Sequence, residues 1–273
     1  MPLADRFDGL LIDLDGVVWI GREPVPGSPE ALRSLLEAGK RLVFVTNNPG
    51  KHPAAYAERL TGMGVEVGPG QIVTAGMVVA RLAGEAAGDG GSAFVIGAPA
   101  LKEMVAAAGA RLVEGEEAWG ADAVVVSGHR GFDYGELLAS KRALDSGAAL
   151  FATSHDPTMP FPGGEVPGTG SILAAVETAS GKRATIAGKP ERHLFEMASG
   201  ALACSFSADE NEKEQAKQRV AMVGDRISSD IEGGRRAGLE TILVLSGTTT
   251  REQAEAADPA PDHVLDDLSG LLA

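Results

Sequence analysis

The sequence has very little cysteine. Its 273 residues contain one, Cys204, so no disulfide bond can form within the chain. We expect Cys204 to be a small core residue at the end of an apolar helix pattern rather than a nucleophile. A chain without disulfides is typical of a reducing compartment, and we therefore expect a cytoplasmic location.

Long apolar runs are also missing. No uninterrupted apolar stretch approaches the roughly 18 residues that a membrane-spanning helix needs. The beginning of the chain carries Asp5 and Asp8, where a secretory signal would need a basic stretch followed by an apolar one. We therefore expect neither membrane insertion nor secretion.

Positive charge is scarce. The chain has 24 Lys and Arg residues against 38 Asp and Glu residues, a formal net charge of -14. Such a surface repels a nucleic-acid backbone, so we expect no nucleic-acid partner. A small anionic substrate can still bind where a local cation attracts it. The apolar content of 44% is enough for one large or two modest domains.

A short apolar run, a turn and an amphipathic stretch recur along the chain, which predicts an α/β fold around a mostly parallel sheet. The first run, residues 10–12, ends at Asp13, and Ser28 is expected to cap a helix that begins at Pro29. Segments 84–92, 156–170 and 205–219 are predicted to be irregular. Further strands are predicted at residues 41–45, 94–96, 124–126, 150–152, 185–187, 220–223 and 241–245.

Polar residues follow several of these predicted strands. Ligand sites in open α/β sheets lie beyond the carboxyl ends of the strands, so we expect the site there. The residues at these positions are Asp13 and Asp15, Thr46 and Asn47, Lys189, and Asp225 with Asp230.

Carboxylates dominate this set. Asp13 and Asp15 cannot both enter the core without a large desolvation cost, and in isolation their spacing more often marks a turn that closes a strand. Combined with Asp225 and Asp230, they form the oxygen-only ligand set that suits Mg²⁺. We expect Asp13 and Asp225 to bind the metal, and Asp230 to bind it directly or through water.

The same residues can perform phosphoryl transfer. Asp13 can attack phosphorus to form an aspartyl-phosphate, and Asp15 can protonate the leaving alcohol and then deprotonate the attacking water. Thr46 and the backbone amides around Asn47 can bind the phosphoryl oxygens, while Lys189 neutralises the charge that accumulates on them.

Four segments resemble the four ordered motifs of the haloacid dehalogenase (HAD) superfamily. They are Asp13-Leu14-Asp15-Gly16-Val17, Thr46-Asn47-Asn48, Gly188-Lys189-Pro190, and Gly224-Asp225-Arg226 with Asp230. Over nearly its whole length the chain is similar to subfamily IIA, the branch of NagD, p-nitrophenyl phosphatases and phosphoglycolate phosphatases. The resemblance implies a Rossmann-like core of residues 1–76 and 182–273 with an inserted α/β (C2-type) cap of residues 77–181. It also adds the backbone carbonyl of Asp15 to the metal ligands and Asn48 to the substrate-binding residues.

The resemblance implies a Mg²⁺-dependent phosphatase that hydrolyses a small phosphate monoester, such as a nucleoside monophosphate, phosphoglycolate, glycerol phosphate or a sugar phosphate. Two alternatives stay open: a phosphotransferase or mutase, and a non-catalytic protein that binds phosphorylated metabolites. His155 lies where the relatives carry other polar groups, so it is either a substrate contact or a solvated loop residue. Relatives often form dimers through their caps, so a homodimer is also open.

Overall fold

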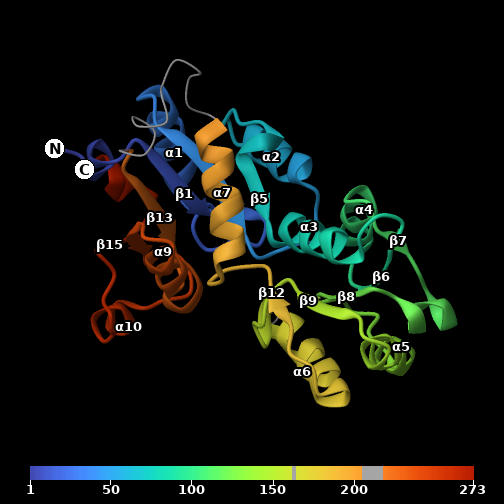
Figure 1. Ribbon diagram of the computed structural model, residues 1–273. Coiled ribbons are helices and arrows are strands. Elements are labelled where there is room, and N and C mark those ends of the chain that lie inside the picture. Colours follow the sequence, from blue (N-terminus) through green and yellow to red (C-terminus); the bar gives the residue numbers. More distant parts are fainter. Residues whose placement is uncertain (162–163, 205–217) are drawn as a thin grey trace. The chain divides into compact units, whose positions relative to one another are not determined.

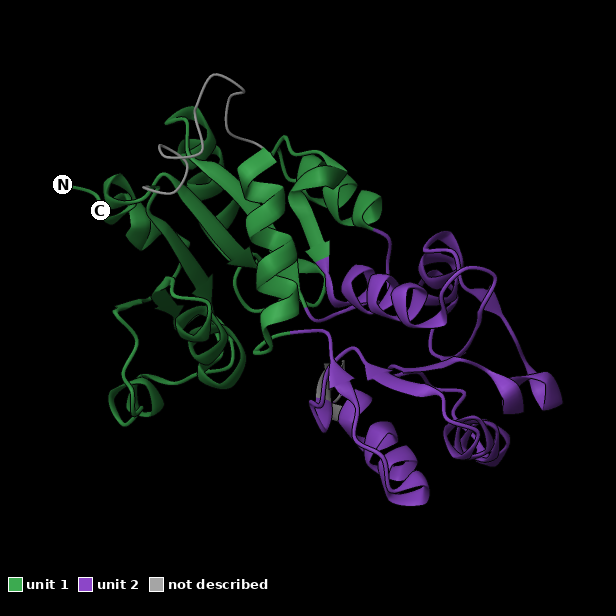
Figure 2. Cartoon of the chain, viewed as in Figure 1, with its two compact units in different colours: residues 1–46, 53–73, 189–273 green, residues 47–52, 74–188 purple. Residues whose placement is uncertain are grey.

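The computed structural model describes residues 1–161, 164–204 and 218–273 (Figure 1). The chain divides into two compact units (Figure 2). Unit 1 contains residues 1–46, 53–73 and 189–273, and unit 2 contains residues 47–52 and 74–188. Because segments of unit 1 lie on both sides of unit 2 in the sequence, unit 2 has the connectivity of an inserted domain.

A six-stranded sheet forms the centre of unit 1, in the order β15-β14-β13-β1-β4-β5. β1 pairs in parallel with both β13 and β4. All five residues of β1 are buried, as expected for a strand covered on both faces. The bounds are β1 (Gly9–Asp13), β4 (Arg41–Thr46), β5 (Ile72–Thr74), β13 (Val220–Gly224), β14 (Glu240–Val244) and β15 (His263–Leu265).

Helices cover both faces of this sheet because side chains alternate along each strand. Leu10 and Ile12 of β1 pack in one apolar cluster with Leu32 and Leu35 of α1, while Gly9 faces Leu202 of α7. Each fully buried leucine or isoleucine stabilises the fold by about 2–3 kcal/mol. The remaining elements of unit 1 are η1 (Leu3–Arg6), a hairpin of β2 (Trp19–Ile20) and β3 (Glu23–Pro24), α1 (Ser28–Glu37), α2 (Pro53–Gly62), η2 (Pro69–Gln71), α7 (Arg192–Cys204), the π-helical turn η4 (Ile227–Ile231), α9 (Glu232–Arg236), α10 (Arg251–Glu255) and η5 (Leu268–Leu272).

Two local predictions for unit 1 are wrong. Ser28 does not cap α1, because its buried hydroxyl donates a 2.9 Å hydrogen bond to the carbonyl of Val17, and Gly27 is the cap residue. Cys204 is exposed rather than in the core. It follows the buried Leu202 by two positions, a rotation of about 200° around the helix, which turns it away from the sheet.

A five-stranded sheet forms the centre of unit 2, in the order β12-β9-β8-β6-β7. Phe94 and Val124 from this sheet pack against Leu144 of α5 and Val176 of α6. The elements of unit 2 are α3 (Ala75–Ala87), β6 (Ser92–Ile96), α4 (Pro99–Ala107), β7 (Arg111–Leu112), η3 (Gly115–Gly120), β8 (Ala123–Val126), α5 (Tyr134–Asp145), β9 (Ala149–Ala152), β10 (Thr158–Phe161), β11 (Gly164–Pro167), α6 (Thr169–Ser180) and β12 (Thr185–Ile186).

The segments predicted to be irregular are partly regular. β10 and β11 form an antiparallel hairpin within residues 156–170, and α6 begins at Thr169. Proline and glycine suggested a loop, but a two-stranded ribbon tolerates proline because each strand has a free edge. In segment 84–92, α3 continues to Ala87 and β6 begins at Ser92. Of segment 205–219, residues 205–217 lie outside the described residues.

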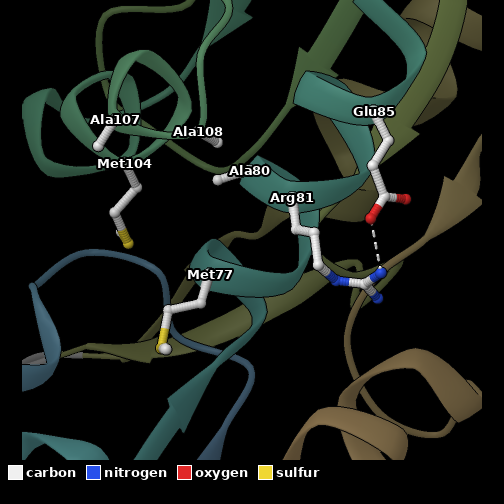
Figure 3. Close-up of a pocket in the computed structure, with 7 residues that line it drawn as sticks. All are labelled: Met77, Ala80, Arg81, Glu85, Met104, Ala107 and Ala108. Carbon is white, nitrogen blue, oxygen red and sulfur yellow. Dashed lines mark hydrogen bonds and ion pairs between the residues drawn. The ribbon is translucent and has the colours of Figure 1, made fainter. Parts of the chain in front are cut away.

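Helices α3 and α4 pack closely in unit 2. A Cβ atom on Gly84 of α3 would lie 2.5 Å from the carbonyl oxygen of Ala108, so only glycine fits there. Beside this contact is a hollow of about 410 Å³ (Figure 3). Met77 and Met104 extend into it from the two helices, and Arg81 pairs with Glu85 at 2.9 Å. Its lining residues are Met77, Ala80, Arg81, Glu85, Met104, Ala107 and Ala108.

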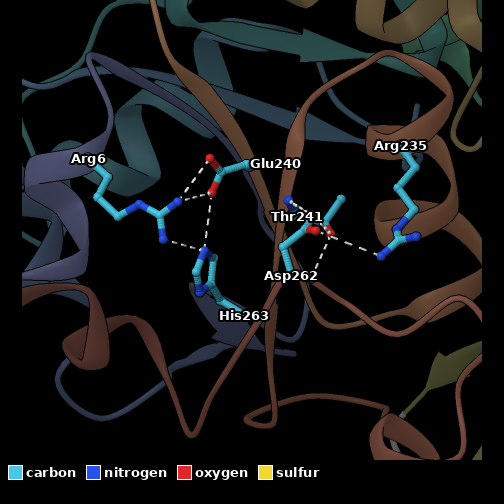
Figure 4. Close-up of polar contacts among 6 residues, drawn as sticks. All are labelled: Arg6, Arg235, Glu240, Thr241, Asp262 and His263. Carbon is cyan, nitrogen blue, oxygen red and sulfur yellow. Dashed lines mark hydrogen bonds and ion pairs between the residues drawn. The ribbon is translucent and has the colours of Figure 1, made fainter.

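Polar contacts fasten the β15 edge of the sheet in unit 1 (Figure 4). Asp262 Oδ2 accepts hydrogen bonds from the backbone nitrogen of Thr241 at 2.9 Å and from its hydroxyl at 2.7 Å. Arg6 donates to both carboxylate oxygens of Glu240, and His263 Nε2 lies 3.2 Å from Glu240 Oε2. Side chains from β14, from the start of β15 and from the N-terminal turn therefore hold this edge together.

Candidate active site

Three neighbouring strands of unit 1 end at the candidate site. Asp13 is the last residue of β1, Thr46 is the last residue of β4, and Asp225 directly follows β13. The register pairs Asp13 with Val45 and Ile12 with Val223, so the three strand ends lie at one edge of the sheet. Asp13, Thr46 and Asp225 are all buried.

A cluster of three buried carboxylates lies at this edge. Asp13, Asp225 and Asp230 each offer one oxygen, and these oxygens lie within 4.8 Å of one another. Asp230 comes from η4, and single π-helical turns of this kind are frequent at functional sites.

Asp225 has one occupied and one unoccupied oxygen. Oδ2 accepts a 2.6 Å hydrogen bond from the backbone nitrogen of Thr248, while Oδ1 is buried and has no hydrogen-bond partner among the described residues. Burial raises the pKa of this carboxyl, the charge of Asp230 raises it further, and the hydrogen bond from Thr248 opposes both effects. A buried anionic oxygen without a partner is costly unless a cation binds it.

Lys189 is the cation of the cluster. Its ammonium nitrogen lies 2.8 Å from Asp13 Oδ1 and 2.7 Å from Asp230 Oδ1. Burial by itself would lower the pKa of Lys189, but the charges of Asp13 and Asp230 raise it well above its ordinary value. Within the part of the chain that the structure describes, Asp230 Oδ1 has no partner besides Lys189. Oδ2 accepts a 3.0 Å hydrogen bond from the backbone nitrogen of Arg226.

The charges of the cluster do not balance. When all four groups are ionised, three carboxylates and one ammonium carry a net charge of two negative units in a buried region. Burial raises the pKa of Asp13 well above its ordinary value; Lys189 opposes this shift, and Asp230 and Asp225 reinforce it. A bound dication would remove the imbalance and occupy the free oxygen of Asp225. Oxygen donors of this kind suit Mg²⁺, so the residues present fit this metal.

Two glycines leave room for the carboxylate of Asp225. A Cβ atom on Gly16 would lie 2.4 Å from Asp225 Oδ2, and one on Gly247 would lie 2.1 Å from the same atom. Gly16 also has a φ of +89°, a conformation that other residues rarely adopt. Both positions therefore need glycine for Asp225 to keep its place.

Asp15 is exposed beside the cluster. Its Oδ1 accepts a 2.9 Å hydrogen bond from Nε1 of Trp19, which is fully buried. The guanidinium carbon of Arg59 lies 3.9 Å from the centre of the Trp19 ring. One oxygen of Asp15 is thus anchored to a rigid aromatic side chain.

The structure brings Asp13, Lys189, Asp225 and Asp230 together at this site. Asn47, Asn48 and His155 belong to unit 2. Asn47 is half-buried, Asn48 Oδ1 accepts a 3.0 Å hydrogen bond from the backbone nitrogen of Gly50, and His155 is exposed in the loop after β9. The substrate contacts predicted for these three residues stay predictions.

Sequence reasoning missed several residues that support the site. Thr248 binds Asp225, and the hydroxyl of Ser246 donates a 2.8 Å hydrogen bond to the carbonyl of Gly16. Ser246 directly follows the strand predicted at 241–245 and Thr248 lies two residues further on, so the rule of carboxyl strand ends could have found them. No sequence signal pointed to Trp19 or Arg59, because their roles arise from contacts between β2 and α2.

Comparisons with known proteins show the family to which the chain belongs. Residues 10–111 match the haloacid dehalogenase-like hydrolase family, and residues 186–271 match a family of HAD-hydrolase-like proteins. Glycerol-3-phosphate phosphatase of Gallus gallus is 36% identical to this chain, in an alignment that covers 97% of this chain and 91% of the relative.

Solved structures show the same similarity. Glycerol phosphate phosphatase from Mycobacterium tuberculosis, in complex with magnesium, has a TM-score of 0.87 and 33% identity, over 99% of this chain and 78% of that chain. The 4-nitrophenylphosphatase from Thermotoga maritima has a TM-score of 0.85 and 33% identity, over 99% and 98% of the two chains. With this similarity along nearly its whole length and a buried carboxylate cluster at the carboxyl edge of its sheet, the chain belongs to the haloacid dehalogenase-like hydrolases.

Proposed function

We propose that the protein is a Mg²⁺-dependent phosphatase that hydrolyses a small phosphate monoester through a phosphorylated Asp13. The observation that carries the proposal is the buried cluster of Asp13, Asp225 and Asp230 with Lys189 as its cation. Among the candidate substrates, glycerol phosphate ranks first, because two of the similar proteins carry that substrate in their names. Nucleoside monophosphates, phosphoglycolate and sugar phosphates follow.

The metal site consists of Asp13, Asp225 and Asp230, with the backbone carbonyl of Asp15 as a further ligand. When bound, Mg²⁺ supplies positive charge that attracts the substrate phosphate and stabilises the charge of the transition state. The free Oδ1 of Asp225 and the uncompensated charge of the cluster support this assignment.

Asp13 is the nucleophile of the first half-reaction. Its Oδ1 accepts a hydrogen bond from the backbone nitrogen of Leu14 at 2.8 Å and lies 2.8 Å from the Lys189 ammonium, so we assign the attack to Oδ2. The bond between phosphorus and the ester oxygen breaks, and protonated Asp15 gives its proton to that oxygen. The products are the free alcohol and the aspartyl-phosphate.

The second half-reaction returns the enzyme to its starting state. The carboxylate of Asp15 takes a proton from water, whose oxygen attacks phosphorus while the bond to Asp13 breaks. Inorganic phosphate leaves, and Asp15 is protonated again. Lys189, Thr46 and the backbone around Asn47 and Asn48 bind the phosphoryl oxygens in both halves.

Phosphate release from a panel of small phosphate esters tests this function. We expect release that requires Mg²⁺, stops with a chelator and falls at least about 10³-fold in Asp13→Asn, because an amide is a poor nucleophile. Asp89→Asn, an exposed aspartate of unit 2, is the matched control and should keep full activity. Activity that survives in Asp13→Asn would contradict the assigned nucleophile.

A phosphotransferase is the rival within the same chemistry. Adding an acceptor alcohol or a second sugar to the reaction distinguishes it from a phosphatase. A phosphatase should release one phosphate per ester cleaved at every acceptor concentration, whereas a transferase should form a new phosphate ester instead. No turnover of any ester, combined with tight binding of one of them, would favour a non-catalytic binding protein.

We assign residues 1–76 and 182–273 to the core domain and residues 77–181 to the cap. The compact unit that spans residues 74–188 supports this division. Within the cap, His155 is an exposed candidate for substrate contact. His155→Ala should raise KM for the preferred ester and leave kcat nearly unchanged, whereas an unchanged KM would exclude the contact.

We also propose that the chain forms a homodimer and acts in the cytoplasm. The apolar hollow between α3 and α4 is the surface that we assign to the dimer, since such surfaces often mark interaction sites. Light scattering should give twice 28.0 kDa, and Met104→Lys should give the monomer mass. Cell fractionation tests the proposed cytoplasmic location. Separately, every helix among the described residues is too short or too polar to span a bilayer.

A further inference from the structure

Trp19 forms a hydrogen bond with Asp15, the residue proposed as general acid and base. The indole is fully buried in the main apolar cluster of unit 1, yet its Nε1 donates to the carboxylate of the exposed Asp15. A buried indole N–H needs an acceptor, and a backbone carbonyl would satisfy it equally well. Here it anchors a carboxylate to which the reaction assigns a proton transfer.

Several contacts prevent the indole from moving. β2 pairs Trp19 with Pro24 of β3, and the ring of Tyr56 is parallel to the indole, with 6.4 Å between the ring centres. Arg59 lies over the indole face and donates a 2.8 Å hydrogen bond to the carbonyl of Gly21 in the turn of the hairpin. The hairpin and helix α2 are therefore fastened to each other through the aromatic ring that holds Asp15.

This anchoring distinguishes the two oxygens of Asp15. Oδ1 is taken by the indole N–H at 2.9 Å, and Oδ2 makes no hydrogen bond with any described residue. The side chain is exposed, so without the indole it would rotate freely. A general acid is effective only when its proton is within hydrogen-bond reach of the leaving oxygen.

We propose that Trp19, held by Arg59, is a positioning residue that orients Asp15 so that its Oδ2 transfers the proton to the leaving alcohol. The proposal rests on the proposed phosphatase function and deepens it. It assigns no contact between Trp19 and the substrate. The loss of activity on removing Trp19 should therefore be larger for esters whose leaving group needs a proton.

Esters with different leaving groups test this dependence. An alkyl phosphate such as glycerol phosphate leaves as a strongly basic alkoxide and needs protonation, whereas p-nitrophenyl phosphate leaves as a stable phenolate and needs little. In Trp19→Phe, which keeps an aromatic ring but removes the N–H, kcat/KM for the alkyl ester should fall at least about 10-fold more than for the aryl ester. This ratio reports the steps through leaving-group departure, so slow hydrolysis of the aspartyl-phosphate does not obscure it.

The chain offers a matched control, because its second tryptophan, Trp119, also lies beneath an arginine, Arg142. Trp119→Phe should leave kcat/KM unchanged for both the alkyl and the aryl ester. In an Asp15→Asn background, Trp19→Phe should have no further effect on the alkyl ester, because the residue that it positions can no longer donate a proton. An additional loss in that background would overturn the proposal.

Equal losses for both esters in Trp19→Phe, or no loss for either, would also overturn the proposal, since a merely structural role does not distinguish leaving groups. If Trp19→Phe does not fold, Arg59→Met provides the same comparison, with an expected selective loss of about 3-fold or more. The proposed phosphatase function fails separately, by the absence of Mg²⁺-dependent phosphate release from the unmodified protein.

Discussion

The ammonium nitrogen of Lys189 lies 2.8 Å from Oδ1 of Asp13, and both side chains are buried. Lys189 is the first residue of unit 1 after unit 2 ends, and Asp13 ends β1, a central strand of unit 1. The pair thus joins segments that lie more than half the chain apart in sequence. Lys189 thereby supplies positive charge to a cluster of three carboxylates.

Lys189→Met should lower both activity and stability. Turnover should fall about 10³-fold, because a charge that stabilises the transferring phosphoryl group is lost. Without metal the variant should also unfold more easily by about 3–5 kcal/mol, because buried carboxylates lose their partner. Urea unfolding with chelator measures this loss, and Lys182→Met, at an exposed position, is the control. A variant as stable as the parent would contradict the role of the pair.

Gly16→Ala should weaken Mg²⁺ binding about 10–100-fold, because the new Cβ displaces the carboxylate of Asp225. Gly21→Ala is a closely matched control. Both glycines have positive φ, +89° and +58°, so both substitutions strain the backbone, but a Cβ on Gly21 would meet no atom of the described residues within 4 Å. Titration calorimetry with Mg²⁺ measures the affinities. Equal weakening in the two variants would mean that backbone strain, and not contact with Asp225, is responsible.

Titration of Asp225 should make the metal-free protein less stable as the pH rises. Burial and the charge of Asp230 raise the pKa of Asp225, so between about pH 4 and this raised pKa the folded state holds a proton that the unfolded state has lost. The contribution of Asp225 to stability is therefore fully present at low pH and is lost as the pH rises through the folded pKa.

Asp225→Asn isolates this contribution. The unfolding free energies of the parent and the variant are measured with chelator at increasing pH. As the pH rises, the variant should become more stable relative to the parent. Saturating Mg²⁺ should reverse this shift, because the metal binds the ionised carboxylate. A difference that stays constant with pH in the metal-free protein would contradict the raised pKa.

Asp262→Ala should destabilise the β15 edge by about 1–3 kcal/mol, because the fully buried Thr241 loses the acceptor for its backbone N–H and its hydroxyl. Asp266→Ala removes a carboxylate at the other end of the same strand. Asp266 pairs with Arg251 in an exposed ion pair, so its loss should cost less than about 1 kcal/mol. Thermal unfolding of the two variants compares them, and equal losses would contradict the contacts assigned to Asp262.

Much of the fold of unit 1 could be predicted because its central strands carry a local signal. β1, β4 and β13 are short apolar runs buried on both faces, and polar residues follow them where the strands end. β10 and β11 had no such signal, since their prolines and glycines suggest a loop until the two strands pair. Cys204 and Ser28 were misjudged because their surroundings are set by a helix phase and by the carbonyl of Val17, neither of which a local pattern contains.

Lys189 lies beside the carboxylates for a reason other than the strand-end rule that pointed to it. It was placed at the site because it follows a predicted strand, but that strand, β12, pairs with β9 in the five-stranded sheet. The chain then returns to unit 1, where Lys189 lies against Asp13 and Asp230. Motif order along the chain identified the residue, while the sheet to which its strand belongs could not be inferred.

The sequence by itself determined the α/β class, the family and the residue types of the candidate site, because hydrophobic periodicity and short motifs are local properties of a chain. Only the tertiary structure decided that Asp225 keeps a buried oxygen without a partner among the described residues, that Lys189 pairs with two of the three carboxylates, and that Trp19 holds Asp15. Lys189 lies far from Asp13 in sequence, and Trp19, although only four residues from Asp15, is held by Arg59 of α2. Such distances are set by packing rather than by any local pattern.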